Sequence, residues 1–167
     1  MINSKFDISQ LPDIQDITGN CVDNTLDNVK KNYRLIKEES YILLNASLNF
    51  SLSKAMTYYN LIFYVEISTK YYLIIKSELS IEKIEGYGHD IYRLLAICKK
   101  YDVSFEKLRF LLDKIKDKNN KKVNLSKYYN FKYNKCVGEL PLIFESKISS
   151  NEKKIVKEVI EWLSSHI

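Results

Sequence analysis

The chain has 167 residues, which is enough for one domain that buries its own core without disulfides or metals. It holds only four glycines and two prolines, which disfavours a sandwich or barrel with many tight turns and favours helices. The net charge of +5 allows a nucleic-acid partner without requiring one, because lysines that accumulate on solvated faces explain it equally well.

The first predicted helix is long. Residues 1–20 form an irregular lead-in, and residues 21–167 form one helical domain. From Val22 onward apolar residues recur in steps of three and four, the pattern of an amphipathic helix that ends near residues 45–50. Asp23 or Asn24 is expected to cap its start. The expected apolar seam is Val22, Leu26, Val29, Tyr33, Ile36 and Leu43.

The second predicted helix, about residues 54–78, is apolar on nearly every side, and Ser51 or Ser53 is expected to cap it. Such a helix must be covered all round, either centrally in a bundle or by a second subunit. We expect both, with one side facing the core and another side facing a homodimer partner.

The rest of the chain predicts three further helices. The segment "SIEKIEGYG" interrupts the periodic pattern, and a third helix begins near His89–Asp90. A fourth follows Ser104 as N-cap, and Asn151 is expected to cap the last. The whole predicts an all-α, up-and-down bundle of four to five helices. The expected inward residues of these three helices are Ile91, Leu94, Leu95, Cys98, Phe105, Leu108, Leu111, Leu112, Ile115, Ile155, Val159, Trp162 and Leu163.

Metal, disulfide and membrane roles are not expected. The three cysteines are far apart with no CxxC pair, and two histidines are too few for a histidine-rich metal site, so we expect no metal and no cofactor. The N-terminal sequence lacks the apolar core of a signal peptide. Glu66 and Lys70 interrupt the longest apolar stretch, which makes it a poor transmembrane candidate. We therefore expect a cytoplasmic protein.

Three segments, taken in order, resemble the HEPN superfamily of small helical-bundle domains. "YYNLIFYVEISTK" is similar to the family's A-x-E-x-x-x-K helix, with Glu66 and Lys70 four residues apart. "GYGHDIYRLL", residues 86–95, resembles its G-H-(D/N)-L-x-x-L segment. "LSKYYNFKYN", residues 125–134, is similar to its YY-x-x-RY-(P) segment. The resemblance covers about residues 48–167 and implies a HEPN-like bundle.

One departure bears on activity. HEPN ribonucleases carry an Arg-x4-6-His motif, and none of the three arginines here is followed by a histidine at that spacing. Lys132 stands where the related segment has arginine, and it supplies charge without the bidentate fork. The resemblance thus implies a non-catalytic module that binds a nucleotide, RNA or a cognate protein in a toxin–antitoxin or phage-defence system, with a nucleotidyltransferase-like partner as one candidate.

Glu66 and Lys70 have two interpretations. One turn apart on an apolar helix, they can form an internal ion pair that fixes the register of the bundle. Alternatively they line a polar pocket in which Lys70 holds a phosphate and Glu66 positions it.

His89 and Asp90 are equally ambiguous. Asp90 is a good N-cap, and His89 can hydrogen-bond within the bundle. His89 is also the candidate catalytic base, since histidine is the side chain that most often serves as a general base.

A basic and aromatic stretch is the best candidate for nucleic-acid binding. It runs from Lys114 to Lys135 and combines cations for phosphates with aromatic faces for bases; its candidates are Lys127, Tyr129, Lys132 and Tyr133. A solvated loop whose tyrosines pack on the core is the alternative.

Two other functions stay open. One is a metal-independent ribonuclease that uses His89 with Lys132 or Lys70. The other is a purely structural helical adaptor whose partner surface is the helix at 54–78.

Overall fold

The computed structural model describes residues 25–50, 53–115 and 147–167. Within these ranges all regular elements are helices, which confirms the all-α prediction, and an isolated antiparallel bridge joins Ser53 to Lys147. The described residues hold six helices where four to five were expected, because the interrupting segment after residue 79 itself forms a short helix capped by Ser80. The six helices are α1 (Leu26–Asn49), α2 (Lys54–Lys76), α3 (Ile81–Glu85), α4 (Ile91–Cys98), α5 (Phe105–Asp113) and α8 (Ser150–His166).

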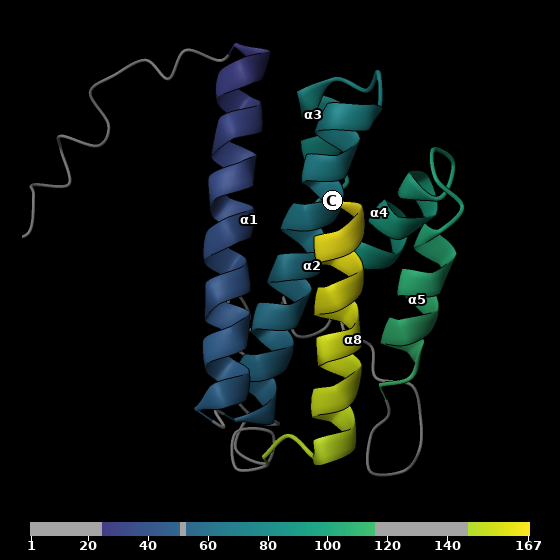
Figure 1. The fold of residues 1–167 in the computed structure, drawn as a ribbon. Helices are drawn as coiled ribbons and strands as arrows, with labels where there is room; N and C mark the ends of the chain where they lie inside the picture. The colour runs from purple at the N-terminus through teal and green to yellow at the C-terminus, as the bar shows by residue number, and fades with distance from the viewer. Residues whose placement is uncertain (1–24, 51–52, 116–146) are drawn as a thin grey trace, which may run out of the picture.

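Helix α2 is the central helix of the bundle (Figure 1). Helix α1 packs antiparallel along it, and α4, α8 and the short α3 pack on other sides. Helix α8 runs in the same direction as α2, while α5 lies against α8 in the opposite direction. Sixteen of the 23 residues of α2 are buried, so the prediction that this helix is covered all round is confirmed. Its exposed large apolar side chains are Met56 and Ile75, and a homodimer through this helix stays a prediction.

The predicted seam of α1 is partly wrong. Leu26, Ile36 and Leu43 are exposed, whereas Val29 and Tyr33 pack against the core as expected. The buried positions are instead Ser40, Leu44, Ser47 and Leu48. The two serine hydroxyls donate to carbonyls one turn back in their own helix, at 2.8 and 2.7 Å, so they can face α2 without an unpaired polar group. The hydrophobic pattern missed them because serine is polar.

The helix caps agree with the sequence in part. Ser53 caps α2 with its hydroxyl, and Ser104 occupies the N-cap position of α5 without a side-chain cap bond. Thr25 precedes α1, and the proposed caps Asp23 and Asn24 lie outside the described residues.

The cap predicted for the last helix is wrong. Ser149, not Asn151, caps α8, and it forms a capping box with Glu152. That reciprocal pair satisfies two backbone N–H groups and so fixes the start two residues earlier than expected.

The inward faces predicted for the later helices are confirmed. All thirteen predicted inward residues of α4, α5 with Ile115, and α8 are buried. They join α1 and α2 in one hydrophobic core, where Phe105 packs edge-on against Trp162 at 5.1 Å between ring centres. In the described part of the chain, none of the helices combines the length and apolar content that a membrane crossing requires.

Candidate functional site

Glu66 and Lys70 form a buried ion pair on α2. The Lys70 Nζ lies 3.0 Å from the Glu66 carboxylate, and the two side chains are 4% and 3% exposed. Burying a lone charge costs far more than burying a paired one, so neither residue can be removed alone without penalty. The internal ion pair predicted from their spacing is therefore present.

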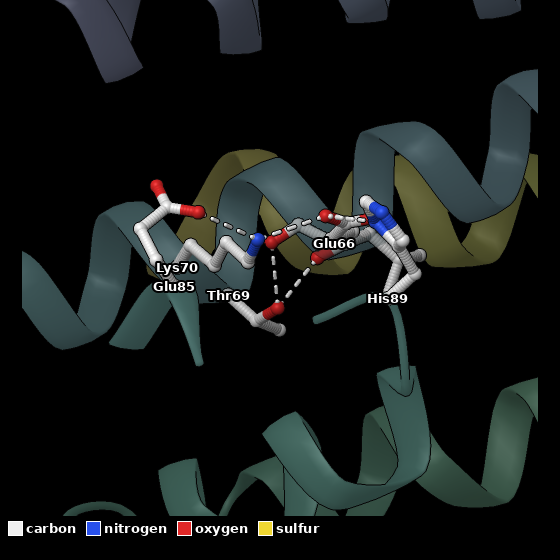
Figure 2. A network of polar contacts seen from close by, with 6 residues as sticks. Glu66, Thr69, Lys70, Glu85 and His89 are labelled. Atoms are coloured by element: carbon white, nitrogen blue, oxygen red, sulfur yellow. Dashed lines mark hydrogen bonds and ion pairs between the residues drawn. The ribbon is translucent and has the colours of Figure 1, made fainter. Parts of the chain in front are cut away.

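Lys70 also reaches a second carboxylate. Its Nζ lies 3.3 Å from Glu85, the last residue of α3, whose side chain is half exposed. The neighbouring Thr69 hydroxyl turns instead to backbone carbonyls of α2 (Figure 2). Because Lys70 is buried between two carboxylates, the geometry favours its structural role over the alternative in which it holds a phosphate.

His89 completes what we call the Glu66 network, consisting of Glu66, Lys70, Glu85 and His89 (Figure 2). The His89 Nδ1 lies 2.9 and 3.0 Å from the two Glu66 carboxylate oxygens. An ionised carboxylate only accepts hydrogen bonds, so Nδ1 carries the hydrogen and, in the neutral ring, Nε2 carries the lone pair. The His89 side chain is 46% exposed, whereas Glu66 is buried. The network thus runs from the core to the surface.

The turn before α4 places His89 over Glu66. Helix α3 ends at Glu85, and Gly88 adopts a positive φ of 61°, which L side chains rarely adopt. Asp90 then caps α4 by accepting a 3.1 Å hydrogen bond from the Arg93 backbone N–H, as predicted. The glycine and the cap together hold His89 between two fixed points.

Two side chains that the sequence did not single out as site residues flank this turn. The Arg93 guanidinium stacks over the Tyr87 ring, with Cζ 5.1 Å from the ring centre. Arg93 is exposed and Tyr87 is partly buried. Glu85 was also missed, because an acid at the end of a short helix has no sequence signal that sets it apart from a solvated one.

A second buried acid lies near the N-termini of α2 and α8. Glu152 accepts hydrogen bonds from Lys54 and Tyr58, both at 2.5 Å, and from Ser149. Burial alone would raise its pKa, but the bonds from Lys54, Tyr58 and Ser149 outweigh burial and lower the pKa to about 2. We call these four residues the Glu152 network.

Other candidate chemistry is limited. Cys98 is buried, and burial raises the pKa of its thiol to about 12, so it is a poor nucleophile. Among the described residues, no cluster of three histidine, cysteine or acidic side chains could hold a metal ion. The nucleic-acid candidates Lys127, Tyr129, Lys132 and Tyr133 lie outside the described residues and stay predictions.

Comparisons of the chain with protein-family models, with curated proteins and with solved structures gave no match. The HEPN resemblance therefore rests on the three sequence segments alone. Two of these segments carry Glu66 with Lys70 and His89 with Asp90, and they are the two that meet in the Glu66 network.

Proposed function

We propose that the chain is a HEPN-like helical module that binds single-stranded RNA or a nucleotide without cleaving it. One observation supports this most: His89 and Glu66, 23 residues apart in sequence and each in a segment of the resemblance, are in direct contact at 2.9 Å. Two weak sequence patterns that converge on one site are less easily explained by chance than either alone. The absence of an Arg-x4-6-His motif favours binding over cleavage.

The placement of His89 supports a binding role. A half-exposed imidazole whose Nδ1 is held by a buried carboxylate has its orientation fixed before any ligand arrives. A side chain held in this way loses little freedom when a ligand binds beside it. The lysines and tyrosines predicted to bind nucleic acid at 114–135 would add contacts along the strand.

The same geometry favours a second candidate, a metal-independent ribonuclease with His89 as base. A carboxylate that holds the Nδ1–H of a histidine is the arrangement by which enzymes orient a general base. Such an enzyme would also need a cation beside the scissile phosphate. Lys70 is buried between Glu66 and Glu85, so Lys132 is the better of the two lysines considered.

A gel of end-labelled single-stranded RNA separates these functions. The RNA is incubated with metal-free protein in EDTA, at low and physiological salt, and run under native and denaturing conditions. We expect intact RNA with a salt-sensitive shift that weakens in His89→Ala and persists in His166→Ala, the change at the chain's other histidine. Cleavage that is lost only in His89→Ala would replace binding by the ribonuclease. Intact, unshifted RNA would contradict both RNA binding and the ribonuclease.

The HEPN resemblance also suggests which proteins this chain assembles with. We propose a homodimer, and a cognate nucleotidyltransferase-like protein as partner in a toxin–antitoxin or defence pair. Light scattering coupled to gel filtration tests the first, with twice the 19.7 kDa chain mass as the expected result. A monomer at micromolar concentration would contradict it.

A further inference from the structure

An exposed arginine lies over an aromatic ring close to His89 in the sequence. The Arg93 guanidinium lies over the Tyr87 ring, 5.1 Å from its centre, and both residues lie within four positions of His89 in the chain. Stacking on an aromatic ring orients the guanidinium plane, which a lysine ammonium cannot reproduce. Since Arg93 is exposed, the outer face of this plane is accessible from solvent.

The acidic groups around the turn are already engaged. Glu66 accepts from Lys70 and His89, Glu85 pairs with Lys70, and Asp90 accepts from a backbone N–H at the start of α4. By contrast, the Arg93 guanidinium forms no ion pair within 4.0 Å in the described part of the chain. Among the described residues, the positive charge of Arg93 therefore has no carboxylate partner, although Glu85 and Asp90 are close to it in the sequence.

From this arrangement we propose that the Arg93–Tyr87 stack is a subsite for one unpaired base of single-stranded RNA. The base stacks on the outer face of the guanidinium. Unpaired bases stack on aromatic rings and on arginine planes alike, and such stacking tolerates any base. This inference rests on the proposed RNA binding and adds to it the residues that recognise the base.

The test compares two labelled ligands by fluorescence anisotropy. One is a short oligoadenylate, and the other is an abasic ribose–phosphate strand of equal length and charge. We expect the unaltered protein to bind the oligoadenylate about fivefold or more tightly than the abasic strand, because one stacked base contributes a factor of that order. Arg93→Lys should keep the affinity for the abasic strand and lose the part of the difference, about fivefold, that one stacked base contributes. A purely structural role of Arg93 would weaken both ligands together.

Matched variants separate stacking from folding. Tyr87→Leu should reduce the preference as Arg93→Lys does, whereas Tyr87→Phe keeps the ring and should leave it unchanged. Arg34 has an exposed side chain on α1, so Arg34→Lys is the control for loss of an arginine elsewhere in the chain. If the protein binds RNA but Arg93→Lys retains the full preference, the subsite is wrong and RNA binding stands. If the unaltered protein binds neither strand, the proposed function fails with it.

Discussion

The Glu66 and Glu152 networks each place a buried glutamate beside a lysine of α2, yet they differ in what else they reach. The Glu152 carboxylate is held by Lys54, Tyr58 and the capping-box serine, all of which fix the start of α8 against α2. The Glu66 carboxylate is held from inside by Lys70 and from outside by a half-exposed histidine. A buried acid is therefore not in itself a sign of function, and the two networks differ in that an exposed histidine contacts Glu66, whereas a lysine, a tyrosine and a serine hold Glu152.

The backbone segments that position the two networks also differ. The capping box at Ser149 satisfies the helix start locally, so its geometry follows from secondary structure alone. The turn that carries His89 contains a glycine at positive φ, connects α3 to α4 and brings His89 to Glu66 of α2. The position of His89 therefore depends on contacts among three helices rather than on one local cap.

The largest expected effect is on Lys70. Changing Lys70→Met leaves the Glu66 charge buried with only His89 as partner, and we expect a loss of about 3–5 kcal/mol in the free energy of unfolding. Urea unfolding followed by circular dichroism measures it. The double variant Glu66→Leu with Lys70→Met removes both charges and should recover much of the loss. A loss below about 1 kcal/mol in the single variant would mean that water reaches the Glu66–Lys70 pair and that the pair is not a buried one.

The Glu152 network should control stability in acid. Its folded pKa of about 2 lies below the ordinary value of 4.5, so its contribution is complete above about 4.5 and is lost as the pH falls toward about 2. Glu152→Gln should cost about 1–3 kcal/mol at neutral pH, because hydrogen bonds to a charged acceptor are replaced by weaker ones. Unfolding free energies measured from pH 7 to pH 2 should show a smaller decline in Glu152→Gln than in the unaltered protein. Parallel declines would assign the acid sensitivity to other carboxylates.

A smaller effect is expected at the turn. Gly88→Ala places a Cβ at φ 61°, where nothing lies within 4 Å of it, so the cost is that of the backbone alone, about 1 kcal/mol. Thermal unfolding measures this cost, and the anisotropy of labelled RNA shows whether the affinity for RNA has changed. Gly86→Ala is the steric comparison, since its Cβ would lie 3.1 Å from the Glu82 carbonyl oxygen. A Gly88→Ala protein of unchanged stability would show that the turn readily adopts another conformation.

Much of the fold follows from periodicity. The burial of α2, the inward faces of α4, α5 and α8, and the Asp90 cap could be predicted, because apolar spacing and capping are local properties of the sequence. The core face of α1 could not be predicted, because Ser40 and Ser47 are polar in the sequence. In the structure they are buried, since their hydroxyls donate hydrogen bonds to backbone carbonyls of the same helix.

The sequence identified several residues of the site, but it did not predict the contacts between them. The spacing of Glu66 and Lys70 indicated their ion pair, and the sequence singled out His89 as a candidate. The approach of His89 to Glu66, and of Glu85 to Lys70, depends on how α3 folds back on α2. No local pattern encodes that approach, because it is set by tertiary packing and by the conformation of one glycine.

The most direct test of the account compares His89→Ala with Glu152→Gln in two measurements, the dissociation constant for oligoadenylate and the free energy of unfolding. We predict that His89→Ala weakens RNA binding about fivefold and costs about 1 kcal/mol of stability or less, as expected for one half-exposed hydrogen bond. Glu152→Gln should show the reverse, with a larger loss of stability and unchanged RNA affinity while it remains folded. RNA affinity that is unchanged in His89→Ala, or reduced equally in both variants, would contradict the assignment of function to the Glu66 network.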